Sequence, residues 1–437
     1  LGFKIATSQY ATGQWHELAL RTARFDAVDD RHVVWVGLPG YISSDYPGFL
    51  FPPQPIHLWH NSAPEILMQR IPIGTGPYRV SSWEGNELAL EANPFYVGSK
   101  PWIESVVFKQ LNADTVYWPE ALKAGTCDII LPDNFDSSKR WLTWEKAVDL
   151  KDAVIWYVPS SMVLRLDFNL ADQSKRVIPL NSTRTRLALA NCISRENLME
   201  LPLGAYAIPA VSFIPPLHPA YEPDTVWRVP FSIEVGQGIL HEEGWSDIDG
   251  DGIREAHQVQ GVRDGTPMTL TLATSTYHLA VAETLAEDFE KCGVGITIDA
   301  SGPQEFYAAS AVSPLVNGSF DLALTKWHAE PADCLAWMSH NLAKPGIVNR
   351  HVNYGAYSDS AFDDACLLAR STLDAQSQAI AIQTAQDILA DAHATLFLVW
   401  QPKWLLSQPD LTELFISGTA SWTIYQPEKM RWLDDIQ

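Results

Sequence analysis

Basic residues are scarce in this chain compared with acidic ones. Among its 437 residues, 30 are lysine or arginine and 52 are aspartate or glutamate, so the formal net charge is −22. A surface with this balance repels phosphate groups, which excludes nucleic acid and an anionic membrane surface as the main partners. Hydrophobic residues make up 46% of the chain, which is typical of a folded globular protein and not of a disordered acidic tail.

Long apolar runs are also missing. No stretch approaches the roughly 18 consecutive apolar residues that a membrane-spanning helix needs. Residues 1–4 contain neither a basic segment followed by an apolar one nor a small-residue cleavage site, so no signal peptide is recognised at this point. The chain as given is therefore expected to fold in water.

Cysteines are few and widely separated. They are Cys127, Cys192, Cys292, Cys334 and Cys366, and no two have the spacing of a CxxC metal or redox motif. Two interpretations stay open, because free cysteines are often buried in cores and exported proteins use them in disulfides. The odd number leaves at least one thiol unpaired within a single chain.

Familiar catalytic motifs are absent from the sequence. It contains no G-x-S-x-G elbow, no G-x-x-x-x-G-K-[ST] phosphate loop, no G-x-G-x-x-G after a strand and no H-E-x-x-H. Carboxylate pairs such as Glu242 and Glu243 carry little information in so acidic a chain. We therefore predict a binding protein without a catalytic cofactor. A hydrolase that uses scattered carboxylates on a mixed α/β scaffold is the less favoured alternative.

Length and periodicity predict a mixed α/β protein with more than one lobe, because 437 residues are too many for one ordinary core. Residues 269–272 alternate as a strand, and apolar side chains of residues 279–289 then fall on one helical face. Gly293 ends this helix, and residues 296–298 begin another strand. This succession is a βαβ unit of the kind that builds a largely parallel sheet.

The most specific pattern is the order of elements in residues 74–130. It consists of a Gly/Pro turn at 74–78, an alternating strand at 87–91, a strand at 106–108, a helix ending at 123–125 and a strand at 128–130. This order resembles the extracellular solute-binding proteins of family 5, the oligopeptide and dipeptide type, which deliver ligands to ABC importers. Further phrases match in the family's order from about Ala23 to the C-terminus, at 168–169, 183–195, 204–206, 212–216, 244–252, 320–327 and 357–363.

The resemblance implies a bilobal periplasmic-binding-protein-like fold of type II, the peptide-binding class, with mixed sheets and a hinge between the lobes. The implied parts are the remainder of a small accessory lobe with the entry to the first lobe (1–82), the first lobe (83–160 and 410–437) and a large C-terminal lobe (161–409). The chain would cross between lobes near 160–162 and near 409–414, and closure about this hinge would bury the ligand.

Members of the resembled family begin with a secretion signal, often with a lipid-anchored cysteine. A sizeable segment then precedes the residues that correspond to 31–36 here, so we expect this chain to lack its N-terminal segment. The implied location is extracytoplasmic, periplasmic or at the cell surface. Membrane contact is expected only through the importer's permease or a missing lipid anchor. An exported protein permits disulfides, and Cys334 with Cys366 is the preferred pair.

Six residues are predicted to line the ligand cleft: Trp327, His328, Glu330, Tyr277, His278 and Phe213. Trp327 follows an apolar strand, at the end of the strand where open α/β sheets place ligands, and its ring is expected to stack on the ligand. Peptide-binding relatives have a "GW…DY…DP/EP" phrase here. Residues 326–331 keep the Trp and the acidic residue before proline but lack the Asp-Tyr, so Glu330 is expected to supply the carboxylate for a peptide's ammonium group.

Tyr277 and His278 lie where a strand ends and a helix begins. Hydroxyl and N–H groups of residues 274–276 gather there and favour a carboxylate or another acceptor-rich group. The alternative is a helix cap with an ordinary surface histidine. Phe213 lies where the family brings a loop to the cleft edge, and plain loop packing is its alternative.

An acidic loop is the sharpest local motif. Its carboxylates are Asp247, Asp249, Asp251 and Glu255, with Gly252 after the third. Carboxylates at alternate positions followed by glycine can bind Ca²⁺, but the twelfth position is Gln258, so Glu255 would have to complete the set. The favoured alternative is an Asx-rich turn held by side-chain to backbone hydrogen bonds.

The predicted ligand is a peptide or peptide-like solute. The 17 tryptophans and the missing Asp-Tyr leave an oligosaccharide as an alternative ligand on the same scaffold, because tryptophan rings stack on sugars.

Overall fold

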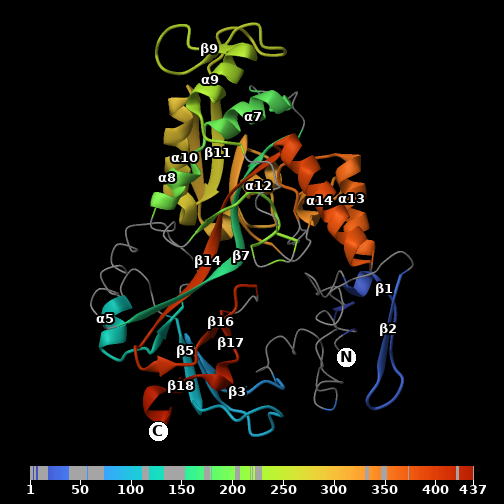
Figure 1. The fold of residues 1–437 in the computed structure, drawn as a ribbon, viewed down its shortest axis with the longest axis vertical. Helices are drawn as coiled ribbons and strands as arrows, with labels where there is room; N and C mark the ends of the chain where they lie inside the picture. The colour runs from blue at the N-terminus through green and yellow to red at the C-terminus, as the bar shows by residue number, and fades with distance from the viewer. Residues whose placement is uncertain are drawn as a thin grey trace.

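The computed structural model describes most of the chain. The described residues are 3, 6–7, 18–38, 57, 73–110, 118–131, 153–171, 178, 180–201, 207–216, 218, 220–221, 229–329, 334–345, 352–372, 374–419 and 423–436. Figure 1 shows them as an upper body of helices around a large sheet and a lower group of smaller sheets.

Two long strands connect the upper and lower parts. β7 (Val154–Phe168) and β14 (Thr395–Ser407) pair antiparallel, and both run from the upper helices to the lower strands (Figure 1). They are central in a seven-stranded sheet of order β12-β11-β13-β7-β14-β6. β6 is Ile129–Ile130, and the short strand β8 (Ile208–Pro209) also pairs with β14.

One side of this sheet contains the predicted βαβ unit. β11 (Thr269–Ser275) continues through the 3-10 turn η3 (Thr276–His278) into α10 (Leu279–Lys291), and β12 (Gly295–Ser301) follows. β11 pairs parallel with β12 and with β13 (Leu322–His328). The prediction of a βαβ unit in a parallel arrangement is therefore confirmed.

Helices cover both faces of the large sheet, because its central strands carry apolar side chains on both sides. On β7, Leu164 and Leu166 belong to one core, whereas Val163 belongs to another. The first core includes side chains of α7 (Thr183–Asn191), α8 (Arg195–Glu200), α9 (Ile233–Glu242) and α10. The second includes side chains of α13 (Ser360–Ser371) and α14 (Ala375–Ala392).

The pairing of β7 with β14 is irregular where the strands leave the upper part. Val158 pairs with Lys403 and Met162 with Gln401, so residues 159–161 of β7 face Pro402 alone. Proline has no backbone N–H group, so Pro402 cannot donate a hydrogen bond to the neighbouring strand. The irregularity in β7 coincides with the crossing that the sequence places near residues 160–162. The lobe boundaries and the hinge motion themselves stay predictions.

The lower part is built from short antiparallel strands. β3 (Tyr78–Glu84), β4 (Glu87–Ala92) and β5 (Ser105–Lys109) form one sheet, at the positions where strands were predicted, and α5 (Trp118–Lys123) follows. The last strands of the chain are β15 (Leu411–Thr412), β16 (Phe415–Ile416), β17 (Ile424–Tyr425) and β18 (Arg431–Trp432). Their side chains share a core with Ile103 and Ile129.

The other described elements are short. They are β1 (Thr22–Ala27), β2 (Val33–Gly37), β9 (Trp245–Ser246), β10 (Glu255–Ala256), α11 (Pro303–Phe306), α12 (Pro314–Asn317), η4 (Leu335–Trp337), η5 (Pro427–Lys429) and η6 (Leu433–Ile436). Within the described ranges, no helix combines the length and apolar character needed to cross a membrane.

Two disulfides link elements of the upper part. Cys334 and Cys366 are bonded, as the sequence prediction preferred, and this bond ties the residue before η4 to α13. A second disulfide joins Cys192 with Cys292, the C-terminal cap residues of α7 and α10, and was not predicted. The chain has five cysteines, so one must remain unpaired within it, and this one is Cys127.

Candidate functional site

The carboxyl ends of three strands meet at one edge of the large sheet. β11, β12 and β13 are parallel and end at Ser275, Ser301 and His328. His328 is in register with Met162 of β7, so this edge lies beside the irregular stretch of β7 where the chain passes to the lower part (Figure 1). Open α/β sheets bind ligands at such an edge.

His328 contacts the strand that connects the two parts. Its Nε2 lies 3.1 Å from the Ser161 hydroxyl oxygen. The next residue, Ala329, donates its N–H to the Ser161 carbonyl at 2.7 Å, and the Ser161 N–H bonds to the Gly418 carbonyl of the lower part at 3.3 Å. Ser161 therefore connects the end of β13 with Gly418 near the last strands of the chain.

Trp327 lies in an aromatic cluster and is only 7% exposed. Its ring meets Trp337 edge-on at 5.0 Å, and Trp337 contacts Phe213 at 5.4 Å. The Arg165 guanidinium lies 5.5 Å from the Trp327 ring centroid and 4.8 Å from that of Trp337. The structure thus connects two of the predicted site residues, Trp327 and Phe213, through Trp337.

The cluster rests on a buried ion pair. Arg165 Nε is 3.1 Å from Asp167 Oδ2, and both side chains are almost completely buried. Burial raises the pKa of Asp167, while Arg165 and the hydroxyl of Thr395 act in the opposite direction. Thr395 donates to Asp167 at 2.6 Å and accepts from Trp337 Nε1 at 2.7 Å. Trp337 is therefore held from one face by Arg165 and at its edge by Thr395.

His278 is deeply buried, with 3% of its side chain exposed. Burial, together with the positive charge of Lys326, lowers the pKa of His278 to about 3, so the ring is neutral at neutral pH. Its Nδ1 has no hydrogen-bond partner in the part of the chain that the structure describes. Tyr277 is half-buried, and its N–H bonds to the Ser275 hydroxyl at 3.4 Å, which caps the turn into α10.

Phe213 is buried in this structure, at 1% exposure, and lines a pocket together with Phe397 of β14. Glu330 lies outside the described residues. The remaining candidates, Tyr277 and His278 on one side and Trp327 and His328 on the other, come from the ends of β11 and β13. Their roles in ligand binding stay predictions.

Sequence reasoning missed Arg165 and Trp337. Arg165 and Asp167 lie two residues apart in the mostly apolar second half of β7, and these opposite charges on one face of the strand were the signal of a buried ion pair. Trp337 comes three residues after Cys334. The predicted disulfide of Cys334 with Cys366 indicated that the segment after Cys334 lies against the core, but Trp337 was not predicted as a site residue.

The acidic loop between β9 and β10 brings its carboxylates together. Ligand atoms of Asp247, Asp249, Asp251 and Glu255 all lie within 4.8 Å of one another. The same groups accept backbone hydrogen bonds. Asp247 accepts from Gly250 at 2.8 Å and Gly252 at 3.2 Å, and Glu255 accepts from Ile248 at 2.8 Å. These are the bonds expected of an Asx-rich turn.

The family model described as "Bacterial extracellular solute-binding proteins, family 5 Middle" matches residues 6–348. The chain belongs to this family. The identification predicted from the sequence is thereby confirmed, and so is a binding protein in place of an enzyme, because family 5 consists of solute-binding proteins.

Two curated relatives of this family 5 chain carry names that refer to peptides. The oligopeptide-binding protein AppA of Bacillus subtilis (strain 168) is 25% identical over 238 residues, which are 52% of this chain and 39% of AppA. The peptide transport periplasmic protein SapA of Salmonella typhimurium (strain LT2) is 24% identical over 374 residues, which are 83% of this chain and 61% of SapA. The chain thus spans less than two thirds of the length of these relatives.

Solved structures show the same fold. The structure of Bacillus subtilis AppA in complex with a nonapeptide has a TM-score of 0.73 at 18% identity and covers 99% of this chain and 82% of that chain. NikA from Brucella suis in complex with Fe(III)-EDTA has a TM-score of 0.74 at 19% identity, covering 95% of this chain and 80% of that chain. The predicted bilobal type II fold is therefore confirmed, while the ligands of these structures differ.

Proposed function

We propose that this protein captures a peptide or peptide-like solute between two lobes, as the substrate-binding component of an ABC importer, and releases it chemically unchanged. The family 5 match carries this proposal. The names of AppA and SapA, both of which refer to peptides, support the choice of ligand class. We propose that the solute binds at the strand ends beside the β7 irregularity, because open α/β sheets bind ligands at such an edge.

Ligand binding would act on the equilibrium between open and closed forms. A ligand that contacts both lobes binds the closed form more tightly and increases its population. The Ser161 contacts connect the end of β13 with the lower part, and the irregular pairing beside it has fewer ladder bonds to resist bending. The importer's permease would recognise the closed form.

The proposed site consists of the ends of β11 and β13. His278 is neutral and buried, so it suits a hydrogen bond to the ligand rather than an ion pair. Only 7% of Trp327 is exposed, and Trp337 and Arg165 fix the orientation of its ring. Glu330 is proposed to pair with a ligand's ammonium group, and His328, Tyr277 and Phe213 to complete the lining.

An extracytoplasmic location, periplasmic or at the cell surface, is proposed from the family description and from SapA, which is named periplasmic. The relatives described above give no support for an oligosaccharide ligand or for calcium. The solved structures described above include one complex with a nonapeptide and one with Fe(III)-EDTA.

The decisive experiment identifies the ligand that the protein retains during purification. Native mass spectrometry of the intact chain, followed by denaturation, would release a peptide of defined mass. Calorimetric titration with that peptide, with Fe(III)-EDTA and with a maltooligosaccharide would then compare affinities. Binding of the chelate or the sugar without binding of any peptide would contradict the proposal, and so would cleavage of the peptide by the pure protein.

A further inference from the structure

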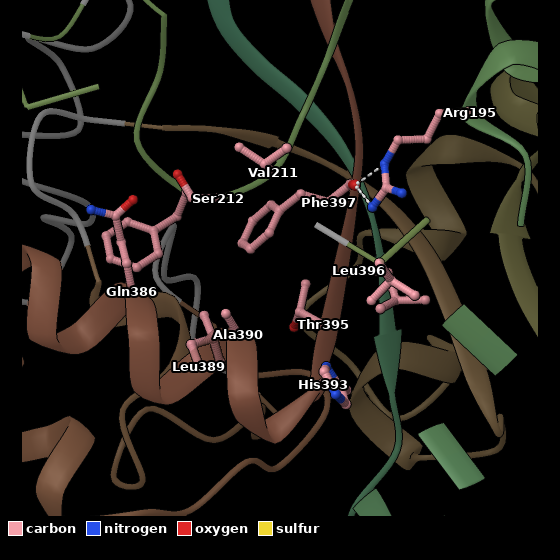
Figure 2. Close-up of a pocket in the computed structure, with 12 residues that line it drawn as sticks. Arg195, Val211, Ser212, Gln386, Leu389, Ala390, His393, Thr395, Leu396 and Phe397 are labelled. Atoms are coloured by element: carbon pink, nitrogen blue, oxygen red, sulfur yellow. Dashed lines mark hydrogen bonds between the residues drawn. The ribbon is translucent and has the colours of Figure 1, made fainter. Parts of the chain in front are cut away.

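A pocket lies in the upper part, between α14, the first residues of β14 and the loop that follows β8 (Figure 2). It contains about 420 Å³ of empty space, part of which is open to solvent. Phe213 and Phe397 in its wall also contact Trp337, so the pocket adjoins the aromatic cluster. Trp327 itself is not part of the wall.

Gln386 is the unusual member of this wall. Its side chain is 3% exposed, and its amide oxygen Oε1 is buried without a hydrogen-bond partner among the described residues. Figure 2 shows Gln386 and Ser212 on the same side of the pocket. A buried amide oxygen without a partner lowers stability, and most such groups in proteins are paired. A hydrogen-bond donor in the pocket would therefore stabilise Gln386 Oε1, because none of the described residues donates to this oxygen.

The other polar groups of the wall are largely engaged. Arg195 donates from Nε and Nη2 to the Phe397 carbonyl at 3.1 and 2.9 Å, the dashed lines in Figure 2. The Thr395 hydroxyl donates to Asp167. Ser212 accepts the N–H of Ile214 at 3.1 Å, which leaves its hydroxyl hydrogen for an acceptor in the pocket.

Among the lining residues that the structure describes, the charged side chain at neutral pH is that of Arg195, and two of its nitrogens are already bonded to a backbone carbonyl. No carboxylate is among the residues that line it in the described part of the chain. The Arg195 guanidinium is directed at a carbonyl oxygen. Burial, together with the positive charge of Arg186, lowers the pKa of His393 to about 4, so that this ring is uncharged at neutral pH. Leu389 and Ala390 add apolar surface.

We infer that this pocket is a second binding site, beside the proposed peptide cleft and sharing Phe213 with it. Its ligand is a small neutral molecule that donates a hydrogen bond to Gln386 and accepts one from Ser212, with a short apolar part against Leu389 and Ala390. A primary amide has this chemistry, because it carries a donor and an acceptor side by side. The inference does not depend on which solute the cleft binds.

Acetamide is the probe for the test. Saturation-transfer NMR on the whole chain is expected to show saturable binding in the millimolar range, the scale for so small a molecule. Crystals soaked in acetamide are expected to show it within hydrogen-bond distance of Gln386 Oε1. Sodium acetate, which has the same shape but is charged and lacks the donor, is expected not to bind.

Gln386→Leu removes the amide while keeping a similar volume, and we expect it to weaken acetamide binding about tenfold or more. Replacing an unpaired buried amide with an apolar group should not lower the melting temperature, so the variant is expected to fold. Gln383→Leu, on the same helix, removes an amide that bonds Asp387 at the surface and is the matched control, with unchanged binding.

Two results would overturn the inference. One is a soaked crystal in which the pocket holds only water although acetamide is present in excess. The other is equal acetamide binding by the wild-type chain and by Gln386→Leu. Neither result bears on peptide binding in the cleft, which is measured separately with the retained ligand.

Discussion

The guanidinium of Arg165 lies 4.8 Å from the ring centroid of Trp337. Arg165 belongs to the long strand β7 and Trp337 to a 3-10 turn after β13, so the contact joins the strand between the lobes to the turn that backs Trp327. An arginine over a tryptophan ring is favourable, more so when both are removed from water. The buried pair with Asp167 fixes the guanidinium in this position.

Removing one member of this pair is expected to be costly. Arg165→Met leaves Asp167 buried without its partner, which should lower the free energy of unfolding by about 3–5 kcal/mol. Arg165→Met with Asp167→Leu removes both charges and should recover much of the loss. Chemical denaturation of both variants measures the difference. The control is Arg24→Met, which breaks an exposed ion pair with Asp26 and should cost less than about 1 kcal/mol.

A double variant as unstable as Arg165→Met alone would show that the loss does not come from leaving the Asp167 carboxylate unpaired. In that case the arginine would contribute more through Trp337 than through Asp167.

Trp327 is expected to contribute to ligand affinity. Trp327→Ala removes the ring at the end of β13, and the affinity for the retained ligand should fall by about 1 kcal/mol or more, as for a typical aromatic anchor. Calorimetric titration measures the loss, and circular dichroism shows whether the variant is folded. Trp83→Ala removes a 61% exposed ring from the lower sheet and should leave the affinity unchanged. Unchanged affinity in Trp327→Ala would place the ligand elsewhere.

The elements near this site could be predicted where the signal is local. The alternation in β11, the apolar face of α10 and the glycine that follows it lie within a few residues of each other, and the structure has all three. The contact of Arg165 with Trp337 was not predictable in this way, because the two residues are far apart in the sequence and neither has a periodic pattern. The same holds for Cys192 and Cys292, which are 100 residues apart.

The position of a residue along a predicted strand also does not determine how deeply its side chain is buried. Trp327 was correctly placed at the end of a strand, but the extent to which Trp337 covers its ring depends on a turn that arrives later in the chain. Likewise, the loop that contains Phe213 has no helical or strand periodicity from which burial could be predicted. The Phe213 ring is buried by side chains from other segments, among them Trp337. Tertiary packing decided both outcomes.

Stability is expected to fall in mild acid because of buried histidine. The pKa of His278 is about 3 in the folded chain, below its ordinary value of 6.5, so the unfolded state binds a proton more readily. The contribution is therefore fully present above pH 6.5 and is lost as the pH falls from 6.5 towards 3, by at most about 1.4 kcal/mol per pH unit. His393, with a pKa of about 4, acts in the same direction.

Urea denaturation at several pH values between 7 and 4.5 checks this prediction. His278→Gln should make the pH dependence shallower over that range. His32→Gln changes an exposed histidine on the β1–β2 hairpin and should leave the slope as in the wild type. A steep slope that His278→Gln does not reduce would assign the acid sensitivity to other groups.

The disulfide between Cys334 and Cys366 is expected to stabilise the second core. Replacing both cysteines with alanine opens a loop of 32 residues and should lower the free energy of unfolding by about 2–4 kcal/mol. Alkylation of the denatured, unreduced protein, followed by mass spectrometry, should modify Cys127 alone. Modification of three or five cysteines would contradict the pairing.

The acidic loop is expected to act as a turn whether or not calcium is added. Its carboxylates already accept backbone N–H groups, and Asp247 accepts two of them, from Gly250 and Gly252. The melting temperature should therefore be the same in excess chelator and in millimolar calcium. Asp247→Ala removes both acceptors and should cost about 1 kcal/mol in either condition, whereas Asp247→Asn retains one acceptor and should cost less. A melting temperature that rises with calcium in the wild type but not in Asp247→Asn would instead identify the four carboxylates as a cation site.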